Sequence, residues 1–154
     1  VLAYTIEECL QIKDATLIGY KINPDHVHLI IQVGDIFNIS QVMHSIKRVS
    51  SDRINQILTF SQRNNPYHAM SWSPKLIDLR TKFEIIYDVK HPHEFPLFRW
   101  QKGFDDQLIR SRSQLIACIN YLKIQHIKHD LDENLGLKIA NSTPRNIRFI
   151  KDKD

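Results

Sequence analysis

The chain has 154 residues, of which 42% are hydrophobic and 25% charged, a composition that suits one folded domain over residues 1–154. The formal net charge of +4 permits an anionic partner such as nucleic acid without requiring one. Two cysteines exclude a disulfide framework, and no apolar run approaches the roughly 20 residues of a transmembrane helix. We therefore expect a cytoplasmic protein with no membrane partner.

The first half of the chain predicts two helices around a β-hairpin. Apolar residues at three- and four-residue spacing predict helices over residues 4–14 and 39–60. Between them, residues 15–22 and 26–33 are rich in β-branched and aromatic side chains, which predicts two strands. Residues 23–25, with the sequence Asn-Pro-Asp, have the composition of a tight turn. We therefore expect the two strands to pair as a hairpin.

The second half predicts one further strand and one long helix. Residues 61–74 are polar and rich in turn-forming side chains, and residues 82–89 contain an apolar run that predicts a strand. Residues 96–104 are expected to be extended. Residues 114–129 predict a helix, and Gly136 marks a break in the tail that follows it.

Hydroxyl side chains stand near the start of each long predicted helix. A Ser or Thr hydroxyl in such a place accepts a hydrogen bond from an N–H group of the first turn. The expected N-cap residues are Thr5, Ser40, and either Ser111 or Ser113.

Two histidines stand on either side of one valine at the head of the second strand. Because side chains of a strand alternate between faces, His26 and His28 point to one side and Val27 points to the other. Two imidazoles on one face can share a metal ion if a third ligand approaches from elsewhere. The alternative is that both are polar residues on the exposed face of a half-buried strand.

The last predicted helix carries residues that suit such a site. Tyr121 and Gln125 are four residues apart, so they lie on one face of the helix, beside its core stripe. An amide oxygen can ligate a hard divalent ion, and a phenol can act as a nucleophile toward a phosphate that a metal polarises. Tyr121 is equally compatible with a rim position that covers the core.

Two other places offer rival chemistry. His91 and His93 flank a proline, and Glu94 follows as a third ligand, although a solvated loop explains the same pattern. Tyr87 is a rival nucleophile, but its apolar neighbours favour packing.

Three blocks of the sequence carry a resemblance to a known family. Residues 19–29 read Gly-Tyr-Lys-Ile-Asn-Pro-Asp-His-Val-His-Leu, residues 100–110 read Trp-Gln-Lys-Gly-Phe-Asp-Asp-Gln-Leu-Ile-Arg, and residues 121–128 read Tyr-Leu-Lys-Ile-Gln-His-Ile-Lys. In this order the blocks resemble motifs of the single-tyrosine HUH transposases of the insertion-sequence and REP-associated group. The corresponding family motifs are Met-Pro-Asn-His-Val-His-Leu, Trp-Gln-x-x-Phe-x-Asp-His-x-Ile-Arg and Tyr-Ile-x-x-Asn-Pro-x-Lys.

The resemblance implies a fold and a chemistry. The fold is α+β, a ferredoxin-like antiparallel sheet with the histidine pair near its middle and helices packed on one face. The chemistry is cleavage and rejoining of single-stranded DNA at hairpin ends, with His26, His28 and Gln125 holding one Mg²⁺ or Mn²⁺ ion. Tyr121 is then the nucleophile that forms a 5′-phosphotyrosine link. The cations expected to contact DNA phosphates are Lys47, Arg48, Arg53, Lys102, Arg110 and Arg112.

The chain also departs from the family pattern. Asn23 and Asp25 replace methionine and asparagine in the turn. Gln125 stands where the REP-associated branch often has asparagine, and His126, which replaces proline, is a competing ligand. Residues 62–97 match none of the motifs, so we expect an insertion there. We also expect the family strand that precedes the first helix to be absent from this sequence.

Two alternative functions and the oligomeric state stay open. A degenerate relative would bind hairpin DNA without cutting it. An unrelated metal-dependent hydrolase would use the histidine pair with Asp25 or Asp106 and would not need Tyr121. Some relatives exchange the tyrosine helix between subunits, so a homodimer stands beside a monomer as a prediction.

Overall fold

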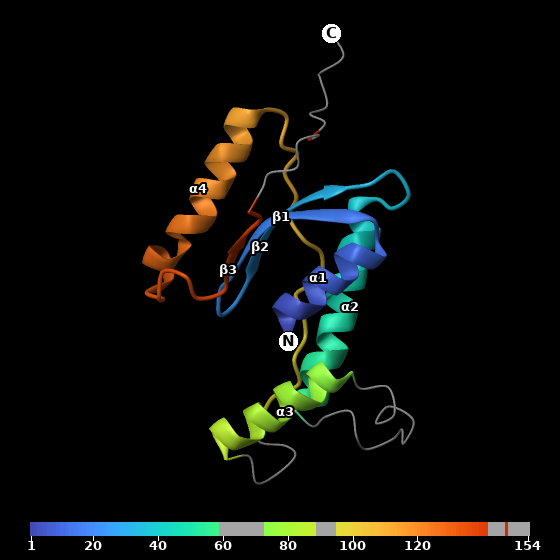
Figure 1. Ribbon diagram of the computed structural model, residues 1–154, viewed down its shortest axis with the longest axis vertical. Coiled ribbons are helices and arrows are strands. Elements are labelled where there is room, and N and C mark those ends of the chain that lie inside the picture. The colour runs from blue at the N-terminus through green and yellow to red at the C-terminus, as the bar shows by residue number, and fades with distance from the viewer. Residues whose placement is uncertain (59–72, 89–94, 142–146, 148–154) are drawn as a thin grey trace. The chain divides into compact units, whose positions relative to one another are not determined.

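The computed structural model describes residues 1–58, 73–88, 95–141 and 147 (Figure 1). Along the chain these residues form α1 (Leu2–Ile12), β1 (Ala15–Ile22), β2 (Val27–Val33), α2 (Ile39–Ile57), α3 (Pro74–Tyr87), α4 (Arg112–His129) and β3 (Leu137–Ile139). The three strands of the described residues make an antiparallel sheet in the order β2-β1-β3. The predicted α+β class is confirmed.

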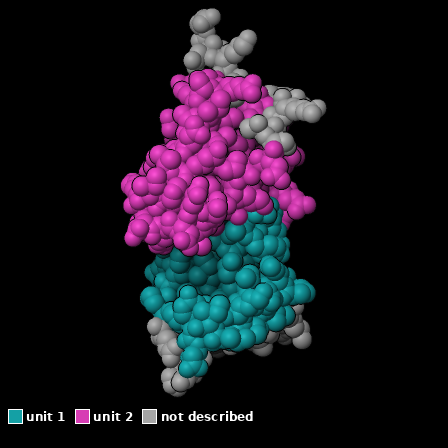
Figure 2. All heavy atoms as spheres, turned by 60° about the vertical axis from the view of Figure 1, so that its left-hand side comes forward, with its two compact units in different colours: residues 1–9, 43–103 teal, residues 10–42, 104–154 magenta. Residues whose placement is uncertain are grey.

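The chain divides into two compact units, which Figure 2 distinguishes by colour. Unit 1 contains residues 1–9 and 43–103, and unit 2 contains residues 10–42 and 104–154. The sheet and α4 belong to unit 2, together with the expected ligands and nucleophile. One domain over the whole chain and an insertion within it both stay predictions.

The hairpin forms as predicted, with small differences in its bounds and place. The N–H group of Asn23 donates to the carbonyl oxygen of His26 at 2.9 Å, which closes the turn. Ile22 lies opposite Val27 in the register of the two strands. Strand β2 begins at Val27, one residue later than expected. It is also an edge strand of the described sheet, whereas the resemblance implied a histidine pair near the middle.

Helix α4 packs on the face of the sheet that carries Gly19 and His28. It contacts all three strands. The buried residues of the shared core are Ile18, Ile30, Leu115 and Leu122. A Cβ atom on Gly19 would lie 3.2 Å from Cδ1 of Leu122 and 3.0 Å from the carbonyl oxygen of Lys138. The missing side chain thus permits the close approach of α4 to the strand that leads to the histidine turn (Figure 1).

Strand β3 is a short element that was not predicted. It pairs with β1 so that Leu137 lies opposite Lys21. Gly136 precedes it at a φ of +67°, and its carbonyl oxygen accepts a hydrogen bond from the N–H group of Ile22 at 2.9 Å. The predicted break at Gly136 is therefore the turn that leads the chain into the sheet.

Helix α3 corrects the strand that was predicted over residues 82–89. Its N-cap is Ser73, whose hydroxyl accepts from the N–H group of Leu76 at 3.3 Å, and Pro74 follows in the first turn. Two side-chain pairs one helical turn apart support it, Arg80 with Glu84 and Lys82 with Asp78. Tyr87, expected in a strand, is the last residue of this helix.

Two predicted helix caps are also wrong. Thr5 lies inside α1, where its buried hydroxyl donates to the carbonyl oxygen of Val1 at 3.1 Å. The cap of α2 is Asn38 and not Ser40, because the Asn38 side-chain oxygen accepts from the N–H group of Gln41 at 2.9 Å.

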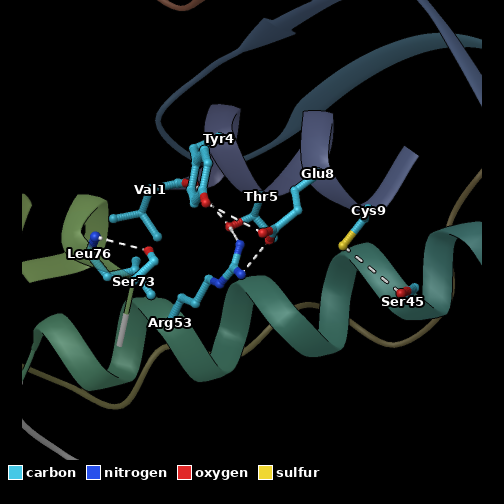
Figure 3. A network of polar contacts seen from close by, with 9 residues as sticks. All are labelled: Val1, Tyr4, Thr5, Glu8, Cys9, Ser45, Arg53, Ser73 and Leu76. Carbon is cyan, nitrogen blue, oxygen red and sulfur yellow. Dashed lines mark hydrogen bonds and ion pairs between the residues drawn. The ribbon is translucent and has the colours of Figure 1, made fainter. Parts of the chain in front are cut away.

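Polar contacts join α1 and α2 in unit 1 (Figure 3). The guanidinium of Arg53 forms an ion pair with the carboxylate of Glu8 and donates to the hydroxyl of Thr5 at 3.2 Å. Only 16% of the Arg53 side chain is exposed. The contacts make Arg53 part of the packing between these helices.

Candidate metal centre and nucleophile

The turn between β1 and β2 brings His26 and His28 together. Both side chains lie on one face, as strand alternation predicts, and their Nε2 atoms are 3.1 Å apart. The rings meet edge to face, with centroids 4.7 Å apart and an interplanar angle of 85°. The two ring nitrogens therefore converge on one point.

Asp25 orients the first imidazole. Its carboxylate oxygen lies 2.7 Å from Nδ1 of His26. Because a carboxylate only accepts hydrogen bonds, Nδ1 carries the proton, and Nε2 of a neutral His26 is left with a lone pair. Hydrogen bonding to His26 lowers the pKa of Asp25 below its ordinary value, so the carboxylate stays charged. This is the arrangement of a carboxylate that supports a metal-ligating histidine.

The surroundings of His28 favour the neutral form of its imidazole. Burial lowers the pKa of its imidazole, and the charge of nearby His26 lowers it further. A hydrogen bond with Gln125 acts in the opposite direction and is the smaller effect. A neutral imidazole is the form that binds a metal.

Helix α4 supplies the predicted nucleophile and third ligand from outside the hairpin. Ser111 caps the helix, as predicted, by accepting from the N–H group of Gln114 at 3.2 Å. The ring of Tyr121 lies edge to face with that of His28, with centroids 5.1 Å apart and an interplanar angle of 79°. Gln125 is only 1% exposed and, one turn along, lies beside the histidine turn.

His126, the competing ligand, faces elsewhere. Its Nδ1 atom lies 2.6 Å from the carbonyl oxygen of Lys123 on its own helix. Gln125 is the buried member of this pair, and its Oε1 atom lies 3.5 Å from Nδ2 of Asn23 in the histidine turn.

The structure adds two residues that sequence reasoning missed. Asn23 is 5% exposed, and its Nδ2 atom lies 3.0 Å from Nε2 of His26 and 3.5 Å from Oε1 of Gln125. The ring centroid of His129 lies 5.0 Å from that of His26. The place of Asn23 opposite His26 in the hairpin was a sequence signal for Asn23. The four-residue spacing from Gln125 was a sequence signal for His129.

These donors fit the expected ion. With ligands at about 2.1 Å in octahedral geometry, adjacent donors lie about 3 Å apart, which matches the separation of the two imidazole nitrogens. A buried amide oxygen lies in the same cluster. Because imidazole is a poorer ligand for Mg²⁺ than for transition metals, the donor set favours Mn²⁺.

The rival metal sites gain no support. His91, His93 and Glu94 lie outside the described residues. Within the described ranges, no three His, Cys, Asp or Glu side chains are grouped closely enough to hold an ion. Asp25 and Asp106, which the rival hydrolase would use, therefore do not complete such a group with the two histidines.

The six cations expected to contact DNA differ in their surroundings. Lys47 donates to the carbonyl oxygens of Gln101 and Gly103, and Arg53 pairs with Glu8. The exposed members of the set are Arg48, Lys102, Arg110 and Arg112. Arg110 and Arg112 belong to unit 2, which contains the histidines, and the other four belong to unit 1.

The fold and the site together describe an α+β protein in which a histidine pair, a buried amide and a tyrosine converge. Comparison with known proteins then identifies its family: the model of IS200-like transposases matches residues 1–77 of the 154. The chain belongs to the IS200-like transposase family, which assigns it a transposase role on DNA. No curated protein and no solved structure matches. No helix of the described residues is long and apolar enough to cross a membrane.

Proposed function

We propose that this chain cleaves and rejoins single-stranded DNA with Tyr121 as the nucleophile. The observation that carries the proposal is the convergence of α4 on the histidine turn, with Tyr121 against His28 and Gln125 buried beside it. The family match ends at residue 77, well before α4. The position of Tyr121 and Gln125 is thus support that is independent of the match.

In the proposed reaction the phenol oxygen of Tyr121 attacks the phosphorus of the scissile phosphodiester. The new bond links Tyr121 to the 5′ phosphate, the bond to the 3′ oxygen breaks, and that oxygen takes a proton from solvent and leaves as a hydroxyl. Tyr121 is 43% exposed, so its own proton can pass to solvent. Attack by a different 3′-hydroxyl reverses the step and completes strand transfer without an external energy source.

His26, His28 and Gln125 would hold a Mg²⁺ or Mn²⁺ ion, whose chemistry is to polarise the scissile phosphate. The chain's own groups prepare that site. Asp25 fixes the orientation of His26, and burial keeps His28 neutral. The edge-to-face contact with His28 limits where the phenol ring of Tyr121 can turn.

The expected substrate is single-stranded DNA with hairpin ends, met in the cytoplasm. Arg110 and Arg112 are the exposed cations next to the start of α4, so we expect them to contact phosphates on the side of Tyr121. A homodimer stays a prediction.

A covalent-adduct assay tests the proposal. The full chain is incubated with labelled single-stranded hairpin DNA and Mn²⁺ and then separated on a denaturing gel beside three variants. Tyr121→Phe and His26→Ala should both lose the shifted band. Tyr87→Phe, which removes an exposed tyrosine of α3, is the matched control and should keep it.

Two results would contradict the proposal. A band that survives Tyr121→Phe assigns the nucleophile to another residue. A panel of hairpins that bind without forming any adduct identifies the chain as a DNA-binding relative that does not cut.

A further inference from the structure

Two polar side-chain atoms are buried without a hydrogen-bond partner among the described residues, Oδ1 of Asn23 and Nε2 of His129. A buried polar group without a partner destabilises the folded chain, so each of the two calls for an explanation. Both residues lie against His26. Both unsatisfied groups thus belong to residues that lie beside His26, an expected ligand of the ion.

Asn23 faces two of the expected ligands. Its amide nitrogen is 3.0 Å from Nε2 of His26 and 3.5 Å from Oε1 of Gln125. Both of those atoms present lone pairs, because the His26 proton is on Nδ1 and Oε1 is an amide oxygen. The amide of Asn23 therefore points at the place where these lone pairs meet.

The two ends of an amide are nearly equal in size, so a half-turn about its terminal torsion exchanges oxygen and nitrogen within the same space. Turned in this way, Asn23 would present Oδ1 to the cation together with Nε2 of His26 and Oε1 of Gln125. The unpartnered oxygen would gain a cation as its partner. The oxygen–metal contact would also offset the cost of burying the amide nitrogen in its place.

We propose that Asn23 is a fourth protein ligand of the ion, through Oδ1. The inference rests on the proposed function, because it assumes that the histidine turn holds an ion. His129 is not chosen, since no three His, Cys, Asp or Glu side chains in the described part of the chain are grouped closely enough to hold one. A hard divalent ion prefers oxygen ligands, and an amide oxygen is one of them. Asn23 would thus give this chain an ion site with one more oxygen.

The test is the Mn²⁺ dissociation constant of the full chain, measured by calorimetry well above the titration range of histidine. Asn23→Leu removes the oxygen at nearly constant size and should weaken binding about tenfold or more. Asn23→Asp keeps an oxygen at the same reach and adds charge, so it should bind Mn²⁺ at least as tightly as the parent chain. Gln56→Leu removes a buried amide from unit 1 and is the matched control, with an unchanged constant.

The outcomes distinguish an error in the proposed ion site from an error in the ligand role of Asn23. If the parent chain binds no Mn²⁺, or if His26→Ala binds it equally well, the ion site of the proposed function is wrong. If His26→Ala loses the ion but both Asn23 variants bind as the parent does, only the ligand role is overturned. If Asn23→Asp weakens binding as much as Asn23→Leu, Asn23 acts as a donor through Nδ2, and the ligand role is again overturned. Should Asn23→Leu fail to fold, the direction of the Asn23→Asp effect decides.

Discussion

The charge state of His28 links the site to the stability of unit 2. Burial lowers the pKa of this imidazole in the folded chain, so its folded value lies below that of the unfolded chain. Between these two values the unfolded chain binds a proton that the folded chain does not. The free energy of unfolding should therefore fall as the pH drops through the ordinary histidine value of about 6.5.

Urea unfolding at a series of pH values, with a chelator present, measures this effect. His28→Gln removes the titrating group, so its free energy of unfolding should depend less on pH than that of the parent chain. Because other histidines titrate in the same range, the difference between the two curves is the quantity that counts. Identical slopes would show that the folded chain does not hold His28 neutral.

Gly19 sets the distance between α4 and β1. In Gly19→Ala the new methyl group would lie 3.2 Å from Cδ1 of Leu122 and 3.0 Å from the carbonyl oxygen of Lys138, so these neighbours on α4 and β3 would have to give way. We expect a loss of about 1–3 kcal/mol in the free energy of unfolding, measured in urea. Thr16→Ala, at an exposed position of the same strand, should stay within about 0.5 kcal/mol. An equal effect of the two substitutions would refute the close approach.

At the scale of elements, Arg53 belongs to the contact between α1 and α2. Arg53→Met leaves Glu8 without its ion pair and Thr5 without a donor, so we expect a loss of about 1–3 kcal/mol in urea unfolding. Arg48→Met, on an exposed position of α2, is the control for stability. DNA affinity should fall no further in Arg53→Met than in Arg48→Met. The reverse pattern, with stability kept and DNA binding lost, would restore Arg53 as a phosphate contact.

The elements that the sequence predicted correctly are those with strong local signals. The hairpin has turn chemistry between two β-branched runs, α2 has a regular apolar stripe, and α4 begins at a capping serine. The apolar residues of α3 cluster at residues 83–87, which is typical of a strand. Ser73 caps a helix there, and the pairs of Arg80 with Glu84 and Lys82 with Asp78 support that helix. β3 has only three residues, and it is a strand because β1 offers it an edge.

In the candidate site, too, some residues were predictable from local sequence signals and others were not. The histidine pair, Tyr121 and Gln125 were predictable because each lies in a short motif with fixed spacing. Asn23 and His129 were not, because their nearness to His26 depends on the register of the hairpin and on the way α4 lies across it. The spacing of His129 from Gln125 and the place of Asn23 opposite His26 point to this site only once the hairpin and α4 are placed against each other.

At the scale of the whole molecule, the ion should couple to folding. The proposed ligands come from the hairpin and from α4, which meet only in the folded chain, so Mn²⁺ should bind the folded state in preference. At a free Mn²⁺ concentration about 100 times its dissociation constant, the stabilisation is about 2.7 kcal/mol. Thermal melts should therefore shift upward with Mn²⁺ and less with an equal concentration of Mg²⁺.

His26→Ala is the control for this shift, because it keeps the fold's apolar core and removes one donor. Its melting temperature should not respond to Mn²⁺. A parent chain whose melting temperature is unchanged across the Mn²⁺ series would speak against an ion site in the histidine turn.

The family assignment and the site depend on different parts of the molecule. The match to IS200-like transposases covers residues 1–77, which include the histidines, whereas the proposed nucleophile lies on α4. The proposed reaction therefore needs both parts: the histidine pair from the matched residues and the nucleophile Tyr121 from α4. Its proposed product is one covalent bond, between the Tyr121 oxygen and a 5′ phosphate of DNA.

The most direct test is mass spectrometry of the protein–DNA adduct after digestion with nuclease and trypsin. Trypsin should release residues 113–123, which contain Tyr121 as their only tyrosine. We expect a nucleotide remnant joined through its 5′ phosphate to the Tyr121 oxygen, formed only when Mn²⁺ or Mg²⁺ is present. A remnant on Tyr87 or another residue, or a link through a 3′ phosphate, would contradict it.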